Sequence, residues 1–168
     1  MNSNNIFIGV DPGQHGGFAV LGPYGLDVWD LKHAYGKTTG FNSLDPLKFS
    51  EMIDSAIFNG CNNVKVYIED SLILPRDGAK TSRSVYESRG VMFTVFTLRG
   101  LDVNFVPPVV WKRRFGLLKK DKKASVELVI KLLPDYTDFF QKQYRGRTVL
   151  LDGRAEATLL ALFGQQTN

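Results

Sequence analysis

The sequence predicts an α/β fold in which helices flank a mixed sheet of five strands. Within the first 32 residues, three short runs of strand character follow one another, which is typical of an antiparallel meander. Beyond residue 45, strand-length apolar runs alternate with runs of helical periodicity. The 168 residues can bury a core, and no repeat or linker interrupts them. We therefore expect a single domain over residues 1–168.

The strands are assigned from apolar runs and the turns that bound them. The first two flank the turn Asp11–Gly17, where Pro12 and three glycines disfavour a helix. The third alternates in polarity, the fourth is a short apolar run that ends at Glu69, and the fifth precedes a pair of prolines. We expect strands at residues 6–11, 16–22, 26–32, 64–69 and 102–106.

The helices are assigned from apolar spacing and from end signals. Asp45 followed by Pro46 is typical of a helix start, and Pro134 stops a later helix. The first helix has an apolar face of Leu47, Phe49, Met52, Ile53, Ala56 and Ile57. We expect helices at about 46–59, 82–98, 123–133 and 151–163, with loops at 38–43 and 71–80.

The positive charge is concentrated in one segment. Residues 112–123 carry seven basic side chains against one acid, a local excess of +6 in a chain whose net charge is +4. A solvated face would explain such a run, but a single basic segment on a nearly neutral body also fits an anionic partner such as DNA. The basic residues are Lys112, Arg113, Arg114, Lys119, Lys120, Lys122 and Lys123.

Other features of the composition concern the compartment. No long uncharged apolar run predicts a membrane span, and the first five residues do not have the character of a secretory leader. Cys61 is the one cysteine, so no internal disulfide can form. We expect a cytoplasmic protein with no membrane partner.

Two acids at strand ends are expected to converge. Because side chains alternate between the faces of a strand, Asp11 shares a face with Gly9, and Glu69 shares one with Tyr67. If the first and fourth strands are neighbours, Asp11 and Glu69 lie on the same side of the sheet. Asp70 would then point to the other side, so Glu69 is favoured over Asp70.

A second pair of acids lies in the last helix. Asp152 and Glu156 are four residues apart, which places them on one helix face, one turn apart. Alone, this pair is explained as well by a helix cap and a solvated residue. Four converging carboxylates, however, repel by about 3 kcal/mol per pair at roughly 5 Å, so they need a cation or shared protons. Oxygen ligands suit Mg²⁺ or Mn²⁺, and two such ions would support phosphodiester hydrolysis.

The motifs that carry a family resemblance occur in order along nearly the whole chain. They are Gly9-Val10-Asp11-Pro12-Gly13, Ile68-Glu69, Glu87-Ser88-Arg89-Gly90, Pro107-Pro108-Val109-Val110-Trp111-Lys112 and Asp152-Gly153-Arg154-Ala155-Glu156-Ala157. With them the chain resembles the RuvC-type Holliday junction resolvases of the ribonuclease H-like superfamily, and more closely their phage and plastid branch.

The resemblance implies a homodimeric, Mg²⁺-dependent endonuclease that cuts four-way DNA junctions, and other branched DNA, by paired symmetric nicks. Asp11, Glu69, Asp152 and Glu156 match the metal-binding acids of the family. Bacterial members space the last two acids by three residues and end with Asp, whereas this chain spaces them by four and ends with Glu. Both spacings keep the acids on one helix face, so which acid binds which ion stays open.

The remaining candidate residues surround these acids. In the loop after Glu69, Leu72 or Ile73 is the candidate for the residue with which the family probes the junction centre, and ordinary loop packing explains them equally well. In the same loop Arg76 and Lys80 are candidates for phosphate contacts, and one lysine of the basic segment for stabilising charge in the transition state. His15 is interpreted as incidental or as a group that holds a water or a phosphate. Trp111 and Phe115 are interpreted as core residues, with base stacking as the alternative, and the apolar stripe of the Ser82–Leu98 helix is a candidate dimer interface.

Three other functions remain open from the sequence. The Asp-x-Gly turn also begins actin-like and sugar-kinase ATPases, although those need two such domains and no phosphate-binding Gly-rich motif occurs. A junction-binding protein without catalysis would not require four acids. A ribonuclease acting on RNA–DNA hybrids would share the metal site and is the hardest to separate.

Overall fold

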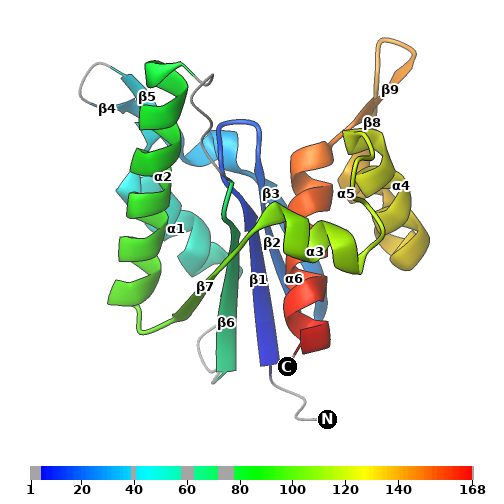
Figure 1. Ribbon diagram of the computed structural model, residues 1–168, viewed down its shortest axis with the longest axis horizontal. Helices are drawn as coiled ribbons and strands as arrows, with labels where there is room; N and C mark the ends of the chain where they lie inside the picture. The colour runs from blue at the N-terminus through cyan, green and yellow to red at the C-terminus, as the bar shows by residue number, and fades with distance from the viewer. Residues whose placement is uncertain (1–4, 39–40, 58–62, 72–77, 168) are drawn as a thin grey trace.

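The computed structural model describes residues 5–38, 41–57, 63–71 and 78–167, with the side chains of residues 38, 41, 42 and 79–81 outside this description. Its centre is a five-stranded sheet in the order β3-β2-β1-β6-β7 (Figure 1). The predicted mixed five-stranded sheet flanked by helices is confirmed. The strands of this sheet are β1 (Asn5–Asp11), β2 (Gly17–Gly22), β3 (Gly25–Asp30), β6 (Asn63–Glu69) and β7 (Asp102–Val106).

The sheet is mixed because the meander and the crossovers meet at β1. β1 pairs antiparallel with β2, and β2 with β3, while β1 pairs parallel with β6, and β6 with β7. The helix α2 (Ala79–Leu98) forms the crossover from β6 to β7. The parallel pairs bring the carboxyl ends of β1, β6 and β7 to the same edge of the sheet, where Asp11 and Glu69 lie.

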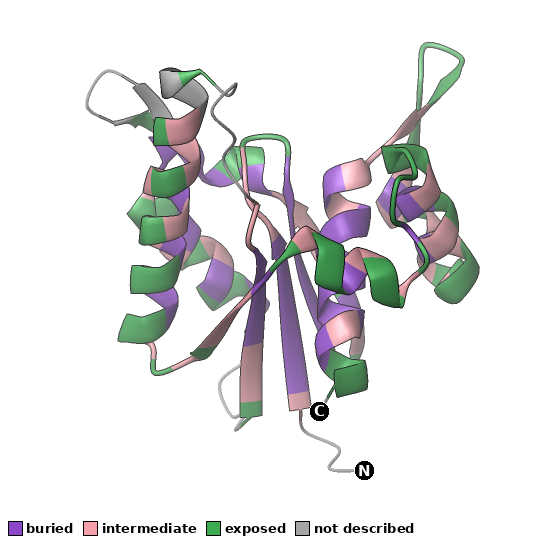
Figure 2. Ribbon diagram, in the orientation of Figure 1, coloured by how far each residue is buried: buried purple, intermediate pink, exposed green. Residues whose placement is uncertain are grey.

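Each face of the sheet has its own core (Figures 1 and 2). Alternate side chains of β1, such as Ile8 and Val10, pack with α1 (Pro46–Ala56) and α2. The other side chains of β1, such as Phe7, face α6 (Asp152–Thr167) and the helices around it, α3 (Pro108–Arg114), α4 (Lys122–Leu132) and α5 (Thr137–Phe140). The short 3-10 turns η1 (Leu31–Ala34) and η2 (Pro134–Tyr136) complete the chain between these elements.

Several predicted boundaries are wrong. The third strand ends at Asp30, because Leu31 and Lys32 belong to η1. The expected loop at 38–43 contributes instead to a two-stranded sheet of β4 (Tyr35–Thr38) and β5 (Phe41–Leu44). The polar composition of residues 38–43 favours a loop, but β4 and β5 nevertheless pair as antiparallel strands. Cys61 lies outside the described residues.

The helices also differ from the prediction. Asp45 caps α1 as expected, with its carboxylate accepting from the amides of Leu47 and Lys48, but Leu47 is 75% exposed and does not belong to the apolar face. The α2 helix begins at Ala79, so the loop after Glu69 is shorter than predicted, and α6 extends to Thr167.

Residues 134–150 had no predicted structure. They form η2, α5 and a hairpin of β8 (Gln141–Tyr144) and β9 (Arg147–Leu150). No helix within the described ranges has the length and apolar character needed to cross a membrane.

Candidate active site

Asp11 and Glu69 lie at neighbouring strand ends on the same face of the sheet. The register pairs Gly9 with Tyr67 and Val10 with Ile68, which brings Asp11 alongside Glu69. Tyr67 packs in the core under α6, so the face that these two acids share is the one covered by α6. The expected facing of Asp11 and Glu69 is therefore confirmed.

The side chain of Asp70 points to the opposite face of the sheet, also as expected. Its carboxylate pairs with Arg89 of α2, with 2.6 Å between the Arg89 Nη2 and Asp70 Oδ1 atoms. Arg89 in turn lies over the ring of Phe105, 4.9 Å from its centroid. Asp70 thus helps to hold α2 against the sheet on the face away from Asp11.

The electrostatics of Asp11 show which carboxylates lie near it. Burial raises the pKa of Asp11 well above its usual value, and the negative charges of Glu69 and Glu156 raise it further. The positive charges of Lys122 and Lys112 oppose this rise only in part. Asp11 is therefore the centre of a cluster that gathers acids from β1, β6 and α6, and that cluster favours a positive charge or a proton.

Glu69 is held by two hydrogen bonds. The indole Nε1 of Trp111 donates to Glu69 Oε2 over 3.0 Å, and the hydroxyl of Ser71 donates to Glu69 Oε1 over 2.5 Å. Trp111 is fully buried in the short helix α3, which begins at the proline pair that follows β7. The predicted core position of Trp111 is confirmed, while Phe115, predicted as core, is partly buried and packs against that core. Trp111 also fixes the direction of an acid.

The two acids of α6 are both paired with lysines. Glu156 is buried, with 5% of its surface exposed, and lies 3.2 Å from Lys112 Nζ and 3.2 Å from the hydroxyl of Ser125. Asp152 begins the helix and lies 2.7 Å from Lys122 Nζ. The hydrogen bond with Asp152 raises the pKa of Lys122. Neither acid is only a solvated residue.

The donor chemistry of this cluster fits a hard divalent cation, since every acidic ligand offers oxygen. In the described part of the chain, however, no three His, Cys, Asp or Glu side chains are arranged as they stand to hold a metal ion. Lys112 and Lys122 contact carboxylate oxygens of Glu156 and Asp152 instead. Asp11, Glu69 and Glu156 are brought together, whereas Asp152 is linked to them through Lys122, which interacts with Asp152, Asp11 and Glu156.

Gly9 in β1, Gly17 at the end of the first turn and Gly153 in α6 allow close helix packing. A Cβ atom at Gly9 would lie 1.9 Å from the carbonyl oxygen of Ala157, and one at Gly17 would lie 2.3 Å from that of Gly153. Gly153 is equally restricted, since its Cβ would lie 2.4 Å from the carbonyl oxygen of His15. At Gly17 the protein itself therefore fills the space beside the backbone. Close packing of α6 against the strands is what requires these glycines.

A salt bridge holds the start of α6 against β3. Arg154 Nε lies 2.6 Å from Asp30 Oδ1, and Arg154 Nη1 donates to the carbonyl oxygen of Phe139 over 3.3 Å. A cavity of about 160 Å³ lies beside this pair. His15, which is exposed, and Asp152, which is partly buried, both line this cavity. His15 is thus near an acid of the cluster, and its role stays a prediction.

The predicted DNA-contacting residues have different surroundings. Lys112 and Lys122 contact the acids, whereas Arg113, Lys119 and Lys120 are exposed around the end of α3 and the turn before α4. Lys123 pairs with Glu127, and Arg114 donates to Gln166. Leu72, Ile73 and Arg76 lie outside the described residues, and Lys80 is described only as part of the α2 backbone.

Sequence reasoning missed three residues that support the acids: Trp111 as a donor, Ser125, and Arg154. The position of Trp111 directly before Lys112 in the proline-containing motif was the available signal, and from one helix turn these two residues contact Glu69 and Glu156. Nothing local in the sequence pairs Arg154 with a residue 124 positions away.

Comparisons with known proteins find similarity in structure only. No family profile and no curated sequence matches the chain. Thermus thermophilus RuvC in complex with a Holliday junction substrate matches with a TM-score of 0.59 at 14% identity, over 97% of this chain and 96% of that chain. Another Thermus thermophilus RuvC structure gives 0.58 at 13% identity, covering 96% of each chain. The yeast mitochondrial Holliday junction resolvase Ydc2 gives 0.52 at 13% identity, over 95% and 77%.

The mixed sheet and its flanking helices thus define a ribonuclease H-like fold. Within that class, the fold is that of the RuvC-type Holliday junction resolvases.

Proposed function

We propose that residues 1–168 form one nuclease domain. This domain is a Mg²⁺-dependent endonuclease that cuts four-way DNA junctions, and other branched DNA, by paired symmetric nicks. The observation that carries this proposal is the convergence of Asp11, Glu69 and Glu156 on one face of a RuvC-type fold. The junction DNA bound to the similar Thermus thermophilus protein supports the choice of substrate.

In this proposal Asp11, Glu69, Asp152 and Glu156 hold the divalent ions, with Mn²⁺ able to replace Mg²⁺. Two bound ions would activate a water and stabilise the leaving oxygen of the phosphodiester. Trp111 and Ser71 keep the Glu69 carboxylate in one orientation, and Ser125 does the same for Glu156. Such fixed orientation is what makes a charged site effective, because no reorganisation is needed during the reaction.

Lys112 and Lys122 have two successive roles in this proposal. In the protein alone they compensate the charge of Glu156 and Asp152, which would otherwise repel the other acids. Bound divalent ions would supply that compensation instead, and the ammonium groups would then be available to contact DNA phosphates or to stabilise charge in the transition state. Arg113, Lys119, Lys120 and the exposed part of Lys123 extend the basic surface for the phosphate backbone.

The test is cleavage of a synthetic four-way junction with Mg²⁺, compared with linear duplex, an RNA–DNA hybrid and turnover of ATP. Wild type should give paired symmetric nicks in the junction, and Asp11→Asn should bind without cutting. Asp102→Asn is the matched control, because Asp102 is exposed at the amino end of β7, away from the cluster. Unimpaired cutting by Asp11→Asn would refute the assignment, and preferred cutting of the hybrid would favour the ribonuclease function.

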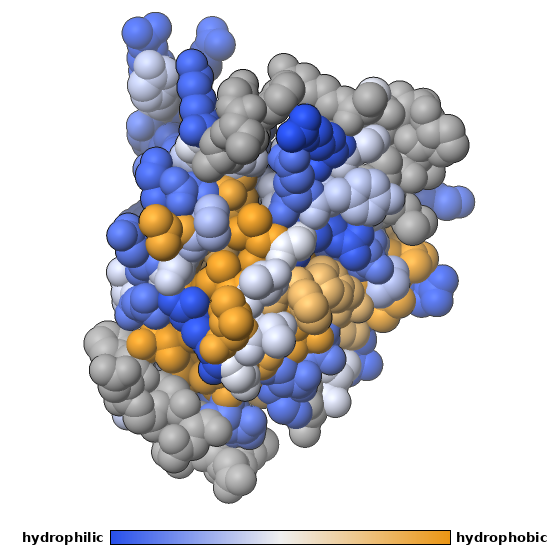
Figure 3. Space-filling model, turned by 90° about the vertical axis from the view of Figure 1, so that its left-hand side faces the viewer, coloured by the Kyte–Doolittle hydropathy of each residue, from blue (hydrophilic) through white to orange (hydrophobic). Residues whose placement is uncertain are grey.

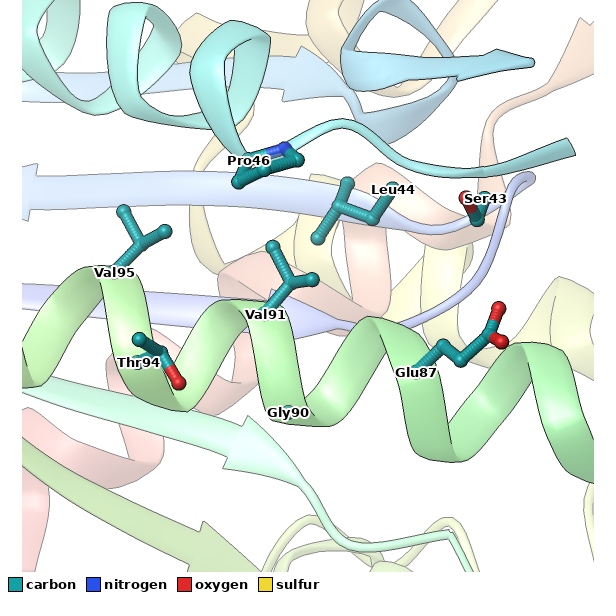
Figure 4. Close-up of a pocket in the computed structure, with 8 residues that line it drawn as sticks. All are labelled: Ser43, Leu44, Pro46, Glu87, Gly90, Val91, Thr94 and Val95. Carbon is teal, nitrogen blue, oxygen red and sulfur yellow. The ribbon is translucent and has the colours of Figure 1, made fainter. Parts of the chain in front are cut away.

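We further propose a homodimer through the groove between α2 and the β5–α1 connection. A cavity of about 520 Å³ runs between α2 and the β5–α1 connection, with Val91 and Val95 facing Leu44 and Pro46 (Figure 4). Figure 3 shows apolar surface gathered on this side of the molecule. Gly90 lines the same cavity, and a Cβ there would meet nothing within 4 Å in the single chain. A mid-helix glycine with open space above it fits close approach of a second copy.

A further inference from the structure

The β8–β9 hairpin extends away from the body of the protein (Figures 1 and 2). Its strands pair antiparallel from Gln141–Leu150 to Tyr144–Arg147, as a sheet separate from the central one. Every residue from 142 to 148 is exposed. A two-stranded hairpin is at best marginally stable in water by itself, and this one contributes little to the core. Stability of the fold therefore does not explain this hairpin, and a contact with another molecule would.

The hairpin is basic and carries its charge to the tip. Residues 141–150 contain Lys142, Arg145 and Arg147 and no acid. The guanidinium of Arg145 lies over the ring of Tyr144, 5.3 Å from its centroid, and Tyr144 is 57% exposed. A cation and an aromatic ring are thus presented together to solvent.

The turn places an arginine where the backbone disfavours one. Arg145 has φ of 49° and Gly146 has φ of 74°, so both central residues are in the left-handed region. Hairpin turns of this kind favour asparagine or glycine at the first position, because other side chains crowd the backbone there. The presence of Arg145 is therefore not explained by turn formation, and a guanidinium at the tip has to serve another purpose.

The hairpin is joined directly to the candidate active site. β9 ends at Leu150, and Asp152 begins α6 two residues later. The amide of Leu151 donates to the carbonyl oxygen of Phe140 over 2.8 Å and closes the base of the hairpin. Figure 1 shows the tip rising at the same end of the molecule as the carboxyl end of β1. A substrate in the active site would pass close to the hairpin.

We infer that the β8–β9 hairpin binds a duplex arm of the substrate, with Arg145 and Tyr144 entering a groove beside the cleaved strand. The inference rests on the proposed function. Four residues per strand give a length of about 13 Å, which exceeds the roughly 8.5 Å depth of the major groove, and a two-stranded ribbon fits the width of that groove. The three positive charges complement the phosphates on either side. The contact would position the DNA without touching the reacting phosphate.

The test replaces the tip with a better turn. Arg145→Asn gives the Asn-Gly sequence that this turn favours, so the hairpin should keep its fold and Tm should stay equal or rise. Lys131→Gln is the matched control, since it removes one exposed positive charge from the far end of α4. Affinity for linear duplex and for a four-way junction is measured without divalent metal at several salt concentrations.

We expect Arg145→Asn to weaken binding of both DNAs about 3- to 10-fold and to lower the salt slope by about 1, while Lys131→Gln binds as wild type does. Adding Arg147→Gln should weaken binding further. Equal affinity and equal salt slope for Arg145→Asn and wild type would overturn the inference. The readout is independent of cleavage: wild type that binds duplex through the hairpin but never nicks a junction would refute only the proposed function.

Discussion

The salt bridge between Arg154 and Asp30 leads to a prediction about how the acids of α6 are held. Arg154 and Asp30 join the first turn of α6 to the end of β3, and their side chains are 23% and 16% exposed. Lys32 also contacts Asp30, at 3.0 Å. Because Asp152 and Glu156 lie on either side of Arg154 in sequence, loss of this anchor should displace both.

The magnitude follows from the pKa of Asp30. Burial alone would raise the pKa of Asp30, but hydrogen bonds and positive charge from Arg154 and Lys32 outweigh it and lower the pKa from 3.8 to about 2. At about 1.4 kcal/mol per unit, this net lowering of the pKa corresponds to about 2.4 kcal/mol, in which the opposing effect of burial is already included. With partial exposure we expect Arg154→Met to lower the free energy of unfolding by about 1–2 kcal/mol, or Tm by about 2–8 °C.

The stabilisation by the Arg154–Asp30 salt bridge should depend on pH in a definite direction. A carboxyl whose pKa is depressed in the folded state stabilises the protein above its unfolded pKa and loses that effect as pH falls from about 4 to about 2. The difference between wild type and Arg154→Met should therefore be full at pH 7 and should shrink below pH 4. In the variant, the pKa of Asp30 measured by carbon NMR should rise.

The assay is a double-mutant cycle of Arg154→Met with Asp30→Asn, read by urea unfolding at pH 7. We expect a coupling free energy of about 1 kcal/mol or more. Single-turnover nicking by Arg154→Met should fall about 10- to 100-fold, because small displacements of reacting groups are costly. Additive effects of the two substitutions on unfolding would refute the anchor.

Three further predictions concern the acid cluster and the dimer. Without metal at pH 7, Asp11→Asn should raise the free energy of unfolding by about 1 kcal/mol. The substitution removes a carboxyl with a raised pKa, whose ionised form destabilises the fold above pH 4. No gain in stability in urea unfolding would contradict this. Trp111→Phe should keep the core but slow single-turnover nicking about 10-fold by removing the donor to Glu69. Gly90→Gln should abolish dimers in light scattering without lowering the Tm of the monomer, because the glycine has open space beside it and glutamine favours a helix. An unchanged mass would exclude this interface.

The sequence determines much of the sheet and the side on which the strand-end acids lie. Strand periodicity is local, so the face shared by Asp11 and Gly9 follows once the strand is recognised. The same is true of Asp152 and Glu156 on one helix face. The number of strands in the central sheet could be predicted for this reason, whereas the pairing of β4 with β5 and the β8–β9 hairpin could not, because their polar sequences carry no strand pattern.

Only the tertiary structure decides what surrounds these acids. The packing of α6 across β1 and β2 requires glycine at positions 9 and 17. The packing of α3 and α6 on this face of the sheet brings Lys112, Trp111 and Arg154 to partners 42 to 124 residues away. Such contacts depend on the distances and angles between whole elements, which no local pattern encodes. The sequence by itself therefore determined which acids share a face, and the docking of α6 decided how close they come and which cations hold them.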